Sequence, residues 1–254
     1  MSNILCKICQ APATHEFDLP ILSGKYIGKY YRCEYCECLF IANTCWLEDA
    51  YKLSSLTSID VSVAQRTLHN YAALRTLHFL LGIKTILDWG CSSGFTVRLL
   101  RDSGIEAYGI DKYAKEKYPG VLSPKNVKIN LISAFEVLEH LESPVDELGE
   151  ILTRSPDYFF FSTQRYSTEQ KKDWSYLDPE HGQHIFFYSD KTLNILGEKF
   201  GYKVFNIGSF GLLYKPNISF FKKNILRVLI NNKALRIQRA IYLALPSRGT
   251  WRDR

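Results

Sequence analysis

The stretch that most constrains this chain of 254 residues is 84–111, near the middle of the sequence. A short apolar run ends at Asp88, and a tight glycine-containing segment follows it. Residues 95–100 then have helical spacing, and a second short apolar run ends at Asp111. This order of strand, glycine turn, helix, strand and acid predicts a βαβ unit with a ligand site where the two strands end.

The turn contains two glycines, Gly90 and Gly94, which allow a sharp bend and let a ligand approach without a Cβ in the way. The helix after them offers free backbone N–H groups at its N-terminus. Asp111 lies 17 residues after Gly94 and is placed to hold ribose hydroxyls. However, the pattern is Asp-x-Gly-x-x-x-Gly, and Asp88 would repel a pyrophosphate. We therefore expect a nucleoside ligand with an ammonium or sulfonium charge.

Two motifs in order, Asp-Trp-Gly-Cys-Ser-Ser-Gly at 88–94 and Ala-Phe-Glu-Val-Leu-Glu-His at 134–140, resemble class I S-adenosylmethionine-dependent methyltransferases. In that family the glycine loop carries the methionine moiety, the acid after the second strand binds the ribose, and the segment after the fourth strand flanks the methyl donor. Ser92 replaces the usual middle glycine. The resemblance implies that S-adenosylmethionine is bound by Asp88, Gly90, Cys91, Gly94, Asp111, Phe135 and Glu136.

The fold class we expect is α/β, with a Rossmann-like doubly wound sheet that is mostly parallel and has an antiparallel last strand. The predicted parts are a zinc-ribbon-like module over 1–50, a methyltransferase domain over 60–215 and basic amphipathic C-terminal helices over 216–254. Residues 46–60 are interpreted as a polar connection. Further predicted elements are helices at 62–81, 144–153, 190–200, 220–230 and 234–245, and strands at 131–135, 158–162, 202–210 and 211–214.

The segment between the second and fourth strands is abbreviated. We expect a short helix after Asp111, closed by Pro119 and Gly120, and then a direct return to the sheet. The family usually holds the adenine here with an acid or an amide. Asn126 or Asn130 could take that role.

Four of the seven cysteines form two Cys-x-x-Cys pairs near the start of the chain, and such pairs suit one tetrahedral structural zinc ion. A ribbon of this size is too small to fold without its metal. Two roles stay open, a structural staple and a lid facing the substrate. Sugar-modifying methyltransferases with an N-terminal zinc module are similar here, which favours the lid. The predicted ligands are Cys6, Cys9, Cys33 and Cys36, with Cys38 as a spare thiol.

Residues 180–188, Glu-His-Gly-Gln-His-Ile-Phe-Phe-Tyr, follow a long polar and aromatic segment. Loops of that length in a compact domain are usually functional. A histidine is suited to removing a proton at neutral pH. We predict His181 or His184 as general base, Glu180 as the residue that orients it, and His140 as third choice. Since no Asp/Glu set at ligand spacing accompanies these histidines, we expect no catalytic metal.

Basic residues concentrate at the end of the chain. Residues 222–254 hold nine Lys or Arg and one acid, a net charge of +8, so the remaining residues sum to −2 against the total of +6. Such helices most often pack on their own domain, and the alternative is peripheral contact with an anionic membrane or partner. Reduced cysteines, no secretory leader and no apolar run of about 20 residues predict a cytoplasmic protein.

Three functions follow from these features. The first is methyl transfer to a small or medium acceptor, with the resemblance favouring a nucleotide sugar or glycan. The second is RNA methylation, with the zinc module and the basic tail holding RNA, but the slightly acidic body and the missing Asn/Asp-Pro-Pro-aromatic signature make nucleic acid the weaker choice. The third is a non-enzymatic scaffold, against which the intact glycine loop and its two acids argue. The methylated atom (O, N or C) and the oligomeric state stay open.

Overall fold

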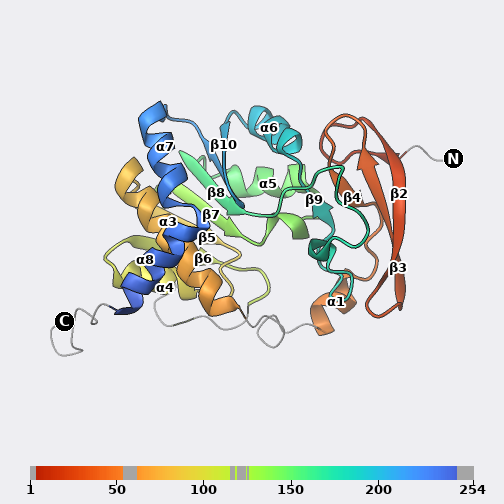
Figure 1. Ribbon diagram of the computed structural model, residues 1–254, viewed down its shortest axis with the longest axis horizontal. Helices are drawn as coiled ribbons and strands as arrows, with labels where there is room; N and C mark the ends of the chain where they lie inside the picture. Colours follow the sequence, from red (N-terminus) through yellow and green to blue (C-terminus); the bar gives the residue numbers. More distant parts are fainter. Residues whose placement is uncertain (1–3, 54–61, 115–117, 119–123, 125, 245–254) are drawn as a thin grey trace.

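The computed structural model describes residues 4–53, 62–114, 118, 124 and 126–244, which form two β-sheets. The six-stranded sheet lies at the centre of the molecule, and a five-stranded sheet stands beside it at the N-terminal end (Figure 1). Most of the short helix predicted after Asp111, with Pro119 and Gly120, lies outside the described residues.

The central sheet has the strand order β10-β11-β8-β7-β5-β6. Strand β5 pairs in parallel with β6 and β7, and β7 pairs in parallel with β8. Strand β11 is antiparallel to both β8 and β10, so the predicted mostly parallel sheet with an antiparallel end is confirmed. Within the described residues no strand follows β6 before β7. The bounds are β5 Thr85–Trp89, β6 Glu106–Ile110, β7 Leu131–Phe135, β8 Tyr158–Ser162, β10 Lys203–Ile207 and β11 Phe210–Tyr214.

Helices cover both faces of this sheet, because side chains alternate along each strand (Figure 1). Ile86 and Phe160 belong to one core cluster, whereas Leu87 and Phe159 belong to the other. Helices α3 (Val63–Leu81), α4 (Phe95–Asp102), α7 (Phe220–Leu229) and α8 (Asn232–Ala244) pack on the first face, and α5 (Pro144–Leu152) and α6 (Asp190–Lys199) on the second.

The N-terminal sheet has the order β1-β2-β3-β4-β9 and takes its last strand from a distant part of the chain. Strand β9 (Phe186–Phe187) pairs antiparallel with β4 (Leu39–Ile41). The strand content predicted for residues 1–45 is present, but the sheet is completed from within the segment assigned to the other domain. The remaining strands are β1 Ile4–Leu5, β2 Pro12–Ile21 and β3 Tyr26–Cys33.

A short helix, α1 (Leu47–Leu53), occupies a segment that was interpreted as a polar connection, so that prediction is wrong for these residues. Its Leu47 and Ala50 are buried beside Trp46. Residues 54–61 lie outside the described part of the chain. The three-residue spacing of the two apolar positions is helical, but the segment is too short to stand out from its polar neighbours.

The C-terminal helices pack on their own domain, as their amphipathic pattern predicts. Leu226, Ile230 and Leu235 are buried in the same core as α3. Phe220 and Phe221, at the start of α7, are 77% and 73% exposed. Within the described chain no helix is both long enough and apolar enough to cross a membrane.

Candidate active site

Strands β5 and β6 end side by side at one edge of the central sheet. Trp89 pairs with Ile110, and the backbone N–H groups of Gly90 and Cys91 both donate to the Ile110 carbonyl, at 2.8 and 3.1 Å. Asp88, one residue before the end of β5, and Asp111, directly after β6, therefore lie at the same edge, where parallel α/β sheets bind ligands.

Both glycines of the turn adopt a left-handed conformation, with φ of +75° at Gly90 and +82° at Gly94. The Gly94 N–H donates to the Cys91 carbonyl at 2.8 Å, which closes the turn before α4. A Cβ on Gly90 would lie 2.6 Å from Cγ2 of Val137. The direction in which a Cβ of Gly90 would point is thus filled by Val137, in the segment after β7, so packing as well as the left-handed backbone requires a glycine here.

The Asp111 carboxylate is held by three backbone N–H groups. Oδ2 accepts from Ser92 at 2.7 Å, and Oδ1 accepts from Tyr113 at 2.8 Å and Ala114 at 2.7 Å. A carboxylate has about four lone-pair sites, so one acceptor site is left for a ligand hydroxyl. The position suits a ribose, with one strong contact rather than the two that were expected.

Asp88 is only 4% exposed, and its carboxylate accepts a hydrogen bond of 2.7 Å from Ser133 Oγ on β7. Burial raises the pKa of Asp88 to about 7, against the lowering effect of the Ser133 hydrogen bond, and repulsion from Asp111 adds to the rise. A cationic group brought near Asp88 favours its ionised form. Ser133 carried no signal in the sequence beyond its place in a strand.

Phe135 and Glu136 follow at the end of β7. The Phe135 ring makes edge contacts with Phe160 and Phe210, at centroid distances of 5.8 and 6.2 Å, so the side chain contributes to the core. Glu136 has φ of +51°, and both its backbone N–H and its carboxylate hydrogen bond to Ser162 Oγ. Burial, followed by the charge of Glu139, raises the pKa of Glu136.

Asn130 lies at the opposite edge of the sheet. Its Oδ1 accepts from the backbone N–H groups of Lys84 and Thr85, both at 3.2 Å, where β5 begins. The side chain cannot reach a nucleoside at the carboxyl ends of the strands, so its predicted adenine contact is wrong. Asn126 is exposed and stays a prediction.

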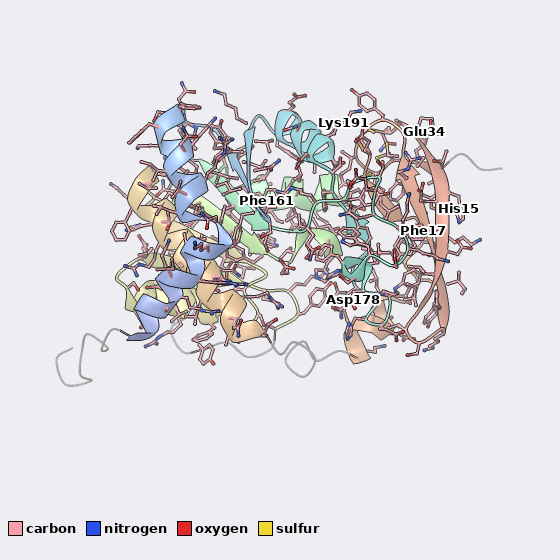
Figure 2. The ribbon with its side chains drawn as sticks, viewed as in Figure 1. His15, Phe17, Glu34, Phe161, Asp178 and Lys191 are labelled. Atoms are coloured by element: carbon pink, nitrogen blue, oxygen red, sulfur yellow. The ribbon has the colours of Figure 1, made fainter. Side chains whose placement is uncertain are left out.

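His181 is oriented by Asp178, not by Glu180. Its Nδ1 lies 2.7 and 2.9 Å from the two Asp178 carboxylate oxygens. The exposed Glu180 instead accepts a hydrogen bond from Ser23 Oγ at 3.1 Å. Asp178 follows a 3-10 turn, Ser175–Leu177, on the segment that lies between the central sheet and the N-terminal strands (Figure 2). Its left-handed backbone, with φ of +47°, turns the chain so that it faces His181.

The other two predicted site histidines, His140 and His184, lie together with Glu139, an acid that was not assigned to the site. The His140 and His184 rings are 5.0 Å apart at 74°. Glu139, on the 3-10 turn Leu138–His140, is fully buried. One potential ligand atom from each of these three residues lies within 4.8 Å of the others. The premise that no carboxylate accompanies the histidines is therefore wrong. Its signal was present in the sequence as the adjacent pair Glu139-His140.

Tyr176 connects this group to the loop before it. Its hydroxyl donates to Glu139 Oε1 at 2.6 Å, and its ring lies 4.7 Å from that of His184. The His184 Nδ1 donates to the Tyr176 carbonyl at 2.7 Å, and the His140 Nδ1 donates to the Gln183 carbonyl at 3.0 Å. Burial and the neighbouring His184 lower the pKa of His140 to about 4, so this imidazole is neutral at physiological pH.

The N-terminal part of the chain covers the histidine segment. Trp46 Nε1 donates to the Gly182 carbonyl at 2.8 Å, and Gln183 Nε2 donates to the Ala50 carbonyl at 3.3 Å. Tyr51 of α1 stacks on Tyr113, two residues after Asp111, with centroids 4.7 Å apart. Helix α1 therefore contacts both the ribose side and the histidine side of the site.

The four predicted zinc ligands converge, with one sulfur atom from each within 4.8 Å of the others. Backbone N–H groups support two of the sulfurs, from Ile8 to Cys6 Sγ at 3.4 Å and from Cys36 to Cys33 Sγ at 3.3 Å. Hydrogen bonds from the Cys36 and Cys38 thiols lower the pKa of Cys6 to about 5, so a thiolate forms readily. This donor set fits a tetrahedral zinc ion. The spare thiol, Cys38, is buried and lies 3.5 Å from both Cys6 and Cys36.

The cysteine cluster is attached to the central domain through the start of α6. Ser189 Oγ and Thr192 Oγ1 both donate to the Cys36 carbonyl, at 2.6 and 2.8 Å. Ser189 Oγ also accepts from the Thr192 N–H at 3.0 Å, which is the N-cap that the sequence predicts. One hydroxyl therefore starts the helix and joins it to the cysteine cluster.

Comparison with known proteins matches residues 64–207 to a family model described as a methyltransferase domain. The fold is similar to human N-acetylserotonin methyltransferase in complex with SAM (10% identity, 67% of this chain and 56% of that chain, TM-score 0.46). It is also similar to magnesium protoporphyrin IX methyltransferase from Synechocystis PCC 6803 with bound SAH (12% identity, 67% of this chain and 94% of that chain, TM-score 0.39). A third similar structure is the methyltransferase domain of bacterial CtHen1 (18% identity, 57% of this chain and 97% of that chain, TM-score 0.39). No curated protein matches the sequence.

Proposed function

Because this chain belongs to the methyltransferase domain family, we propose that it uses S-adenosylmethionine to methylate a hydroxyl of a small or medium acceptor. A nucleotide sugar or glycan is the acceptor class we favour, from the resemblance of the sequence to sugar-modifying methyltransferases. The observation that carries the chemistry is the hydrogen-bonded pairing of His181 with Asp178.

The strand ends fit the cofactor. Asp111 has one acceptor site for a ribose hydroxyl, and Asp88 offers a buried carboxyl group to a cationic group. The backbone of 90–94 bends around the start of α4, which presents N–H groups at its N-terminus. When bound, S-adenosylmethionine supplies a methyl group that is already activated by its sulfonium charge.

The acceptor hydroxyl must lose a proton, and His181 is the base that we propose for this step. Its Nδ1–H donates to Asp178, which leaves the Nε2 lone pair free and stabilises the imidazolium that forms on protonation. His184 was an equal candidate in the sequence, but its Nδ1–H is bound to a backbone carbonyl instead of a carboxylate, and its ring lies against that of His140, 5.0 Å away. We therefore assign the base to His181.

We also propose that the N-terminal module acts as a lid, in addition to its zinc-dependent structural role. Trp46, directly before α1, holds the Gly182 carbonyl, and Tyr51 of α1 stacks on Tyr113 in the loop after Asp111. These contacts order the segment that carries the base, and Tyr51 adds an aromatic surface of the kind on which a sugar or base can stack.

The test measures turnover and cofactor binding separately. His181→Ala should lose at least about 100-fold in turnover, the usual contribution of a general base, while calorimetry shows unchanged binding of S-adenosylmethionine. Asp178→Asn should lose less, and Glu180→Gln serves as the matched control with wild-type activity. Full activity in His181→Ala contradicts the base assignment. No binding of millimolar S-adenosylmethionine to the wild type favours a non-enzymatic scaffold.

The acceptor class is tested with a panel of nucleotide sugars, glycans and short RNAs. Methylation of a sugar with little salt dependence supports the proposal. RNA binding that weakens steeply with salt supports the nucleic-acid alternative.

A further inference from the structure

The group formed by Glu139, His140 and His184 presents only hydrogen-bond acceptors to its centre. A backbone carbonyl can only accept, so the Nδ1 atoms that contact the Gln183 and Tyr176 carbonyls must carry the ring protons. In a neutral imidazole the other nitrogen, Nε2, then has a free lone pair. Two ring lone pairs and one carboxylate are thus brought to within 4.8 Å of one another.

Among the described residues, Glu139 Oε2 has no hydrogen-bond partner, although the side chain is fully buried. Tyr176 satisfies the other oxygen, Oε1, at 2.6 Å. A buried carboxylate oxygen without a donor or a cation is costly, and the charge of Glu139 also disfavours the ionised form of the nearby Glu136. The group therefore lacks a positive charge at its centre.

The arrangement has the form of a metal site with its supporting contacts in place. Metal-binding histidines usually donate the second ring N–H to a carbonyl or carboxylate, which fixes the ring and the tautomer, and both histidines here do so. The supporting carbonyls come from Tyr176 and Gln183, on the same loop that carries His184. This loop thus supplies one ligand and orients both rings.

We propose that Glu139, His140 and His184 bind a divalent first-row metal ion at the carboxyl end of β7, with Glu136 as an adjacent carboxylate. Two imidazoles and a carboxylate suit Mn²⁺, Fe²⁺, Co²⁺ or Zn²⁺ better than Mg²⁺ or Ca²⁺. This reverses the sequence-based expectation of no catalytic metal. The site is distinct from the thiolate cluster, which selects zinc.

The metal site limits the class of acceptor that the enzyme can methylate, and this part of the inference rests on the proposed methyl transfer. A divalent cation lowers the pKa of an oxygen that binds to it and orients that oxygen. An acceptor with two neighbouring hydroxyls can bind through both oxygens, so we expect a vicinal diol of a sugar or ribose. A metal ion held by these residues would make a bound hydroxyl more acidic, and His181 would take the proton from it.

The experiment titrates the whole zinc-loaded protein with Mn²⁺ and follows the electron paramagnetic resonance signal of the free ion. One Mn²⁺ site per chain is expected, with no loss of zinc by elemental analysis. His184→Ala and Glu139→Gln should each weaken Mn²⁺ binding at least tenfold, whereas His181→Ala, three residues from His184, should bind Mn²⁺ like the wild type. Co²⁺ should add a d–d absorption without the thiolate charge-transfer band of the cysteine cluster.

Three results overturn the inference: no metal bound beyond the cysteine cluster, unchanged Mn²⁺ affinity in both cluster variants, or equal loss in His181→Ala. Because Glu139 is buried, circular dichroism checks the fold of its variant, and His140→Ala provides a third, independent removal of a ligand. If methyl transfer proceeds at the full rate in metal-free buffer, the proposed function stands and the metal ion has no part in the reaction. If the protein binds Mn²⁺ but not S-adenosylmethionine, the metal site stands and the proposed function fails.

Discussion

We predict that Asp88 makes cofactor binding dependent on pH. In the free protein its pKa is raised to about 7, so near neutral pH about half of the molecules carry a proton on this buried carboxyl group. A cationic ligand favours the ionised form and lowers the pKa of the group, so binding releases a proton. The affinity for S-adenosylmethionine should therefore rise with pH through 7 and level off above it.

The size of the effect follows from the pKa. At pH 6 only about one molecule in ten has Asp88 ionised, and at pH 8 about nine in ten do. If the ionised form alone binds the cation, the dissociation constant at pH 6 is about tenfold larger than at pH 8, equivalent to about 1.4 kcal/mol.

Isothermal titration calorimetry at pH 6, 7 and 8, in buffers with different ionisation enthalpies, measures both the affinity and the released proton. Asp88→Asn should bind more weakly at high pH and show no pH dependence. Asp111→Asn should weaken binding throughout and move the midpoint to lower pH, because it removes the repulsion that raises the pKa of Asp88. A wild-type affinity that is constant from pH 6 to 8, or a slope that survives in Asp88→Asn, refutes the reasoning.

Three further outcomes are expected. Ser189→Ala should lower the free energy of unfolding by about 1–2 kcal/mol and the melting temperature by about 3–6 °C, because it removes a helix cap and a contact with the Cys36 carbonyl. Ser219→Ala removes the exposed cap of α7 and serves as the control. Its melting temperature in thermal denaturation should fall by less than half as much. Chelating the zinc should lower the melting temperature of the whole chain and abolish methyl transfer, and a melting curve unchanged by metal removal would contradict the zinc assignment. Replacing Phe220 and Phe221 by serine should weaken cosedimentation with anionic lipid vesicles if the basic helices dock there; equal binding by both proteins excludes these residues from such contact.

The central sheet is predicted well from the sequence because each strand is a short apolar run between clear breakers. Strand β8, with five consecutive buried residues, has the predicted bounds, and Ser189 and Gly201 flank α6 as expected. Asp88 and Asp111 are likewise placed by strand order alone, since parallel strands end at the same edge.

The histidine site is less predictable because orientation there depends on turns and distant contacts. Glu180 adjoins His181 in sequence, yet the left-handed turn at Asp178 gives that residue the contact. Glu139 joins His184 only because the loop before β9 folds back onto the turn after β7. Neither a two-residue strand nor a single turn has a periodicity that reveals its partner.

The pairing of β9 with β4 has a consequence for how this architecture can change. Leu39 and Ile41 of β4 are buried in the finished sheet. During synthesis the edge of β4 stays unpaired until β9, about 145 residues later in the chain, has been made. Recombination therefore cannot transfer the N-terminal strands β1 to β4 to another protein by themselves and keep this sheet complete. A chimera that inherits this unit must also inherit β9, so we expect the N-terminal sheet and the loop that carries His181 and His184 to be exchanged together.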